Sequence, residues 1–300
     1  MNSLTVKPQL TKRLTWLDSI RGLAIFFLIL MHYIGALEAR NVLPIEVVDC
    51  IKSIFRVATP LFITVFGFTL AHIFQNKLND VSSLKKLSVW SVKRLPKVFF
   101  AREAIVIIYA LSHPEQLTNL FKTLTYQQFA ISGEILTFYF LAILLAPYIL
   151  YFIVKKKISV SLPIFIILYL VTYYIGSNYH TLSEAFWFRL FFYDVYPFFP
   201  FFSCVIMGIY FAKLYQFLNN DSKRLKVFLT MSIIMIFLGV GFFSIISDNL
   251  LTDLSSAVYK APPHPAYLLF YLGISLFFSC AMAVLIEFNY IPKWINKVLT

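Results

Sequence analysis

Charged residues are scarce in this sequence. Asp, Glu, Lys and Arg make up 13% of its 300 residues, whereas hydrophobic residues make up 60%. A soluble domain has about 25% charged residues and about 45–50% apolar ones. The composition therefore excludes a soluble globular protein and indicates an integral membrane protein, surrounded by the lipid bilayer.

Cysteine is also rare. Cys50, Cys204 and Cys280 lie far apart, and two of them fall in apolar segments. They form neither a disulfide framework nor a zinc-ligand spacing. The sequence shows no haem or iron–sulfur pattern either. We therefore expect no metal ion and no redox cofactor.

Acidic residues are outnumbered, 14 to 26, by Lys and Arg, which gives a formal net charge of +12. In a soluble protein this charge would suggest a nucleic-acid partner. Here the positive charge lies in every second loop, so membrane topology explains it and no nucleic-acid partner is expected. The positive-inside rule places the basic segments in the cytoplasm. These segments are residues 1–13, 75–96, 155–157, 218–226 and 288–300.

Eight apolar segments lie between these loops. Each should be a helix, because lipid offers no partner to unpaired backbone groups. We predict an all-α polytopic bundle of about eight transmembrane helices in one domain (residues 1–300), with both termini cytoplasmic, in the cell membrane. The third segment is short and carries Arg102 and Glu103. The segments are 16–37, 57–74, 97–111, 135–154, 158–175, 198–217, 227–246 and 266–286.

The first segment contains polar residues that a plain membrane span would not need. It reads "LDSIRGLAIFFLILMH" over residues 17–32. Arg21 and His32 are eleven residues apart, so they share one helix face at a separation of about 16 Å. Asp18 is within reach of Arg21. Arg21 could extend to lipid phosphates while His32 bonds a neighbouring helix, or the two could line a functional cavity. The spacing alone leaves both readings open.

The same stretch, extended to Tyr33, resembles the first helix of the transmembrane acyltransferase superfamily. That superfamily includes acyltransferase family 3 and the heparan-α-glucosaminide N-acetyltransferase-like proteins. "TPLFITVFGFTLA" (59–71) is similar to the second span of the superfamily, with Phe66-Gly67 in place of Ser-Gly. The stretches 193–214 and 262–276 resemble the N-acetyltransferase-like branch. Members usually have ten or more spans, so the sequence is expected to be either a short form or a fragment lacking C-terminal helices.

The resemblance implies transfer of an acyl group, expected to be acetyl, from cytoplasmic acyl-CoA (acetyl-CoA). The acceptor would be a sugar hydroxyl or amine of a cell-envelope glycan or glycolipid. His32 would act as general base or transient acyl carrier. Arg21, paired with Asp18, would complete the catalytic group and also contact CoA.

Further site residues are expected on neighbouring segments. Lys93, Arg94 and Arg102 would bind CoA with Arg21, because its phosphates need cationic partners. Lys93 and Arg94 are equally explained as an ordinary cytoplasmic loop. Glu134 would contact the acceptor, although an interfacial Glu needs no such role.

Two other function classes share some of these features. A transporter or flippase-like permease would have the basic loops and the intramembrane charges, but its two halves would more often show paired broken helices. No such symmetry is visible. A non-catalytic membrane scaffold would not need His32.

Overall fold

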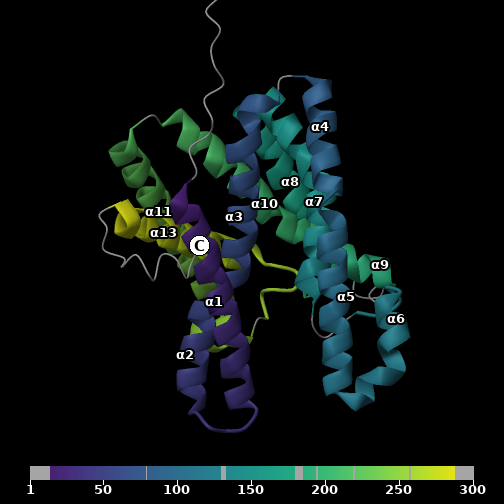
Figure 1. The fold of residues 1–300 in the computed structure, drawn as a ribbon. Coiled ribbons are helices and arrows are strands. Elements are labelled where there is room, and N and C mark those ends of the chain that lie inside the picture. The colour runs from purple at the N-terminus through teal and green to yellow at the C-terminus, as the bar shows by residue number, and fades with distance from the viewer. Residues whose placement is uncertain are drawn as a thin grey trace, which may run out of the picture.

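The described part of the chain is built from helices (Figure 1). The computed structural model describes residues 14–78, 80–129, 133–179, 185–193, 195–218, 220–256 and 258–287. Both predicted basic tails, residues 1–13 and 288–300, lie outside these ranges.

The long helices follow the predicted apolar segments closely, and shorter helices occupy the connections. The helices are α1 (Thr15–Glu38), α2 (Ile45–Phe55), α3 (Ala58–Phe74), α4 (Val81–Val92), α5 (Leu95–Ser112), α6 (Leu120–Leu124), α7 (Glu134–Lys155), α8 (Ile158–Asn178), α9 (Phe186–Phe188), α10 (Phe198–Phe217), α11 (Asp221–Ile246), α12 (Leu250–Ser256) and α13 (Pro265–Glu287). Short turns of other helix types are η1 (Gln75–Lys77), η2 (Pro114–Asn119) and η4 (Arg189–Tyr193).

Seven segments of the described chain are long and apolar enough to cross a membrane. They confirm the predicted all-α polytopic bundle. The segments are Thr15–Glu38, Ile45–Lys77, Glu134–Lys155, Ile158–Asn178, Phe186–Phe217, Asp221–Ile246 and Pro265–Ile286.

The third predicted span differs from a simple helix. Residues 97–111 do lie in a helix, α5, but α4 precedes it where the sequence predicted a loop. Both helices pack beside α7, one after the other (Figure 1). Pro96 in the first turn of α5 has no N–H to continue the hydrogen bonds of α4, so the rod breaks here. Residues 97–111 are therefore helical as predicted, but α5 is not among the seven segments that are long and apolar enough to cross a membrane, so the eighth predicted span stays a prediction.

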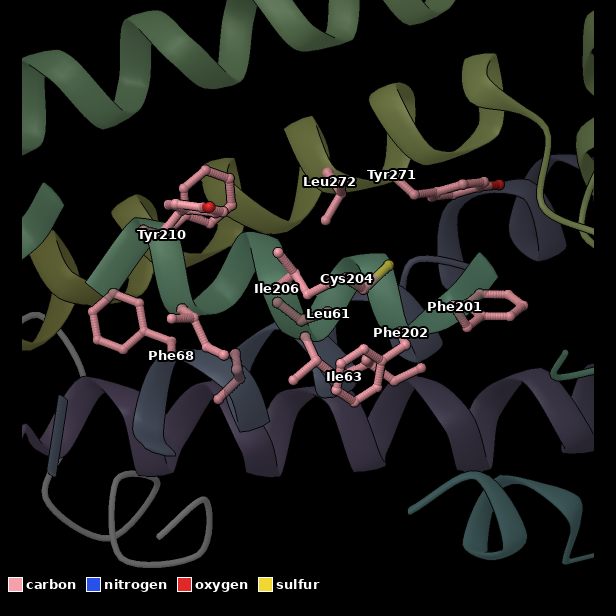
Figure 2. Close-up of a cluster of buried hydrophobic side chains, with 14 of the residues drawn as sticks. Leu61, Ile63, Phe68, Phe201, Phe202, Cys204, Ile206, Tyr210, Tyr271 and Leu272 are labelled. Atoms are coloured by element: carbon pink, nitrogen blue, oxygen red, sulfur yellow. The ribbon is translucent and has the colours of Figure 1, made fainter. Parts of the chain in front are cut away.

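The core of the bundle lies where α3, α10 and α13 meet. Figure 2 shows Leu61 and Phe68 of α3, Cys204 and Ile206 of α10, and Leu272 of α13 in one buried cluster. Large apolar side chains dominate this contact, and their burial holds α10 in the centre of the bundle.

Two glycines let α3 and α10 touch backbone to backbone. A Cβ on Gly67 would lie 2.1 Å from the Val205 carbonyl oxygen, and one on Gly208 would lie 2.1 Å from the Thr64 oxygen. Small residues at such crossings permit close van der Waals packing between membrane helices. This contact fixes α3, which in turn presents its other face to α1.

Helix α1 packs on α2, α3 and α13, and only one of its faces is buried. Leu17, Ile20, Ala24 and Phe27 recur at helical spacing on that face. The neighbouring face carries polar residues and points toward α3 and α7, where the candidate site lies.

Candidate active site

One end of the site is formed by Arg21 on α1. Its Nη1 is 3.0 Å from Asp18 Oδ1, as the helical spacing predicted. Its Nη2 donates a hydrogen bond of 2.6 Å to Thr69 Oγ1 on α3. The Arg21 side chain remains 37% exposed. The guanidinium is thus held in place by two helices and still open to a ligand.

A second guanidinium, that of Arg94, approaches Arg21 from the junction of α4 and α5. The two positive charges lie close enough to repel each other. Arg94 stacks on the Trp90 ring at 3.5 Å and is exposed, as is Lys93 beside it. The fold therefore brings Arg94 near Arg21, and Lys93 is the residue before Arg94 in the sequence.

The other end of the site is a cavity of about 820 Å³ that His32 lines. It lies between α1 and α7, and the first turn of α3 closes it with Ala58 and Thr59. His32 is exposed in the cavity wall. A volume of this size suits a small-molecule ligand or a short saccharide.

Arg21 and His32 lie on one face of an uninterrupted helix, as predicted. Eleven residues at 100° each leave them about 20° apart around the axis and about 16 Å apart along it. Helix α3 runs antiparallel to α1. Its Thr69 lies at the level of Arg21, and its Thr59 lies at the level of the His32 cavity. The two ends of the site therefore face the same side of α1.

Glu134 also lines the cavity, at the first position of α7. It follows Gly133, whose φ of 94° is the left-handed conformation that glycine adopts most readily. Arg102 Nη2 lies 4.0 Å from Glu134 Oε1. The predicted acceptor residue therefore shares the cavity with His32.

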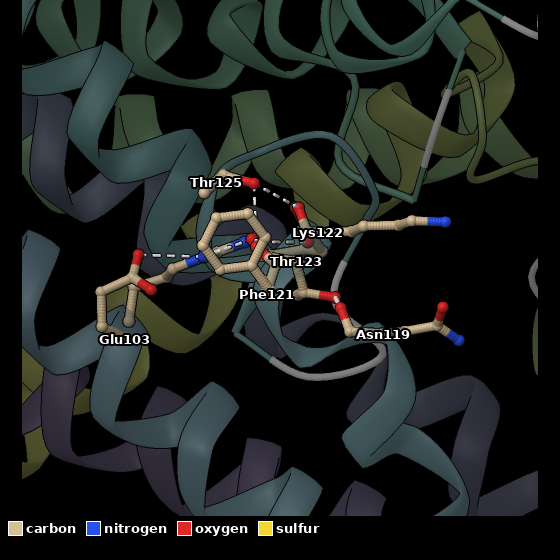
Figure 3. A network of polar contacts seen from close by, with 8 residues as sticks. Glu103, Asn119, Phe121, Lys122, Thr123 and Thr125 are labelled. Atoms are coloured by element: carbon tan, nitrogen blue, oxygen red, sulfur yellow. Dashed lines mark hydrogen bonds and ion pairs between the residues drawn. The ribbon is translucent and has the colours of Figure 1, made fainter.

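Arg102 belongs to a buried polar network rather than to the Arg21 end. Its side chain is 2% exposed, and Nη1 binds Glu103 Oε1 at 2.9 Å and the Thr123 carbonyl at 3.0 Å. Figure 3 shows Glu103 facing the α6 turn that contains Thr123. Arg102 lies eight residues after Arg94, about 12 Å along α5. The structure thus groups it with Glu134 and separates it from the other three predicted CoA contacts.

Sequence reasoning did not single out several residues of the cavity wall. Arg56, Arg189, Tyr196, Lys260 and Tyr267 all line it. The sequence did contain a signal for the cations of this wall. Lys and Arg are infrequent in the loops predicted to lie outside, so those that do occur there are candidates for a functional role. Among the described residues, no group of three or more His, Cys, Asp or Glu side chains is placed to hold a metal ion.

Comparison with known families adds to this geometry. The model of the family described as heparan-α-glucosaminide N-acetyltransferase, catalytic, matches residues 13–245, more than half of the chain. The chain belongs to this family. The matched region includes Arg21, His32, Arg94 and Glu134, whereas Lys260 lies beyond it.

Membership of the heparan-α-glucosaminide N-acetyltransferase family indicates a multi-pass membrane transferase of the acetyltransferase kind. Of the two branches that the sequence resembles, the match is to the N-acetyltransferase-like one. A search of curated proteins and a search of solved structures each gave no match.

Proposed function

We propose that this protein moves an acetyl group from cytoplasmic acetyl-CoA to a sugar hydroxyl or amine of a cell-envelope glycan or glycolipid. The donor binds at Arg21 and Arg94, and the acceptor binds in the cavity beside His32. The observation that carries the proposal is the arrangement on α1, which presents a cationic end and a cavity end on one face.

The donor end fits the phosphates of CoA. Two like charges close together repel each other, and a phosphate between them turns that repulsion into charge-assisted hydrogen bonds. A guanidinium presents its N–H groups in a planar fork that matches phosphate oxygens. Lys93, exposed next to Arg94, adds a third positive charge. With phosphates at this level, the pantetheine arm extends along α1 toward His32, about 16 Å away.

His32 supplies the proton transfer. A neutral imidazole accepts the proton of the attacking hydroxyl or amine as that group bonds to the thioester carbonyl carbon. The carbon–sulfur bond then breaks, and the CoA thiolate leaves and takes up a proton. Glu134 accepts a hydrogen bond from the acceptor and orients it. Arg102 acts as a positioning residue for Glu134 across the 4.0 Å ion pair.

The variant His32→Ala tests this proposal. Loss of a positioned general base lowers the rate by about 10²–10⁴-fold. We expect acetyl transfer by purified protein to fall by that factor, with acetyl-CoA binding retained because the donor end is unchanged. His113→Ala is the matched control, since His113 stacks on Tyr109 at the far end of α5 and is not part of the cavity wall.

The acceptor is identified in the same assay by incubating membranes with radiolabelled acetyl-CoA and isolating the labelled product. If His32→Ala transfers acetyl groups as fast as the parent protein, His32 is not the base. If neither the parent protein nor His32→Ala gives a labelled product, a permease function is favoured over transfer.

A further inference from the structure

Positive charge gathers in the His32 cavity. The four loops predicted to lie outside, residues 38–56, 112–134, 178–197 and 247–265, contain six Lys and Arg residues. They are Arg40, Lys52, Arg56, Lys122, Arg189 and Lys260. Four of the six, namely Lys52, Arg56, Arg189 and Lys260, line this one cavity. Lys and Arg are depleted on the outer side of membrane proteins. The presence of four of them around one cavity therefore indicates that the cavity binds a ligand.

The charges are only partly neutralised within the protein. Lys52 forms an ion pair with Glu38. Arg56 donates through Nε to the Ser255 carbonyl at 2.8 Å, a neutral acceptor that positions the guanidinium. Among the described lining residues Glu134 is the only carboxylate, and it faces Arg102. The cavity therefore has an excess of positive charge.

A buried hydroxyl points to a ligand in the same place. Tyr267, at the start of α13, is 1% exposed and lines the cavity. Its hydroxyl has no hydrogen-bond partner among the described residues. Arg56 and Tyr196 line the same cavity as Tyr267. Lys260 Nζ lies 4.1 Å from the centre of the Tyr196 ring. Buried polar groups are normally bonded, so a ligand atom is expected at this hydroxyl.

We infer that Arg56, Lys260 and the Tyr267 hydroxyl form a subsite for an anionic group, phosphate or carboxylate, carried by the acceptor. All three offer N–H or O–H donors, and two are cations, which is the donor set that such an anion requires. The inference rests on the proposed function, because it takes the cavity as the acceptor site. It adds that the acceptor is an acidic saccharide and that its charge is recognised apart from the group that is acetylated.

A pair of sugar probes with and without a phosphate tests the subsite. The full chain is placed in phosphatidylcholine nanodiscs, and binding of glucosamine 1-phosphate and of methyl glucosaminide is measured by titration calorimetry without acetyl-CoA. The phosphorylated probe should bind more tightly. Lys260→Met should weaken binding of the phosphorylated probe about tenfold, as expected for the loss of one charge-assisted contact. Binding of the neutral probe should be unchanged.

Three further variants separate recognition from structure. Lys260→Arg keeps the charge and should restore most of the binding. Arg56→Gln removes the second cation and should also weaken binding of the phosphorylated probe. Lys122→Met is the matched control, because Lys122 is an exposed cation of an outer loop that does not line the cavity. Equal binding of the two probes to the parent protein, or an equal loss in Lys122→Met, would overturn the inference.

The source of the anion is tested by lipid composition. If phosphatidylglycerol in the nanodisc abolishes the preference for the phosphorylated probe, the cavity holds a lipid headgroup and the acidic acceptor is ruled out.

The subsite and the proposed function can also fail separately. Binding that depends on Lys260 without any acetyl transfer would contradict the function alone. Transfer that is indifferent to acceptor charge would contradict the subsite alone.

Discussion

Arg21 and Arg94 have the same charge, and the fold nevertheless brings them together. The interaction between partly solvated charges is small, so the protein can tolerate their repulsion without a ligand. Arg21 also has structural partners in Asp18 and Thr69. For Arg94, the contact among the described residues is with the aromatic ring of Trp90. Arg94 is therefore the better residue for separating ligand binding from folding.

Removal of the Arg94 side chain should weaken binding of the acetyl donor without destabilising the fold. A hydrogen bond to a charged group contributes about 1.5–3 kcal/mol. We expect Arg94→Ala to lower acetyl-CoA affinity by about tenfold to a hundredfold, with affinity for acetyl-pantetheine, which lacks the nucleotide phosphates, unchanged. Equilibrium binding of both donors in nanodiscs measures this. Lys86→Ala, which removes an exposed cation of α4, is the control. An equal loss for both donors would assign Arg94 a structural role.

At the residue scale, what could be predicted depended on whether partners share one element. Arg21 and His32 are on one helix, so the 3.6-residue period was enough to place them on one face. Arg102 finds its partners in the α6 turn and at the start of α7. Tyr267 and Arg56 line one cavity although more than 200 residues of sequence separate them. No local pattern carries that information. The infrequent cations of the outer loops were the available signal for the cavity wall.

At the element scale, hydrophobicity located the spans but missed α4. Its sequence mixes Ser and Lys with apolar residues, so it has no membrane-span signal. Its start was nevertheless encoded, because Asp80 Oδ1 accepts a hydrogen bond of 2.9 Å from the Ser83 amide in a capping box. Arg94 therefore lies at the junction of two helices, within electrostatic range of Arg21, rather than in the loop that the sequence predicted.

The α3–α10 crossing sets the position of Thr69 and Thr59, and Gly208 controls that crossing. A Cβ there would meet the Thr64 oxygen at 2.1 Å, which forces the helices apart. We expect Gly208→Ala to destabilise the fold by about 1–3 kcal/mol, the usual cost of overpacking. Thermal unfolding in detergent measures the change. Gly241→Ala on α11 is the matched control, because nothing lies within 4 Å of the added Cβ. It should be neutral or stabilising, since Ala favours helix over Gly. Equal stability of the two variants would contradict the close crossing.

At the scale of the whole molecule, the proposed function requires the two ends of the site to face different compartments. If the donor is cytoplasmic acetyl-CoA, the Arg21 end is the cytoplasmic one and the His32 cavity opens toward the outer half of the bilayer. The described chain has seven segments that are long and apolar enough to cross a membrane. The alternation of basic loops is a separate signal, taken from charge alone, and it predicts which side of the membrane each loop faces.

Cysteine labelling of intact cells tests this sidedness. In a Cys50→Ser background, Lys122→Cys should react with a membrane-impermeant maleimide from outside. Lys156→Cys should react only after the cells are permeabilised. Both positions are exposed in the structure, and Cys204 and Cys280 are buried, so background reaction is low. Reaction of position 156 in intact cells would invert the topology. The Arg21 end would then face away from the cytoplasmic CoA pool, and the proposed direction of acetyl transfer would be wrong even if both binding sites were intact.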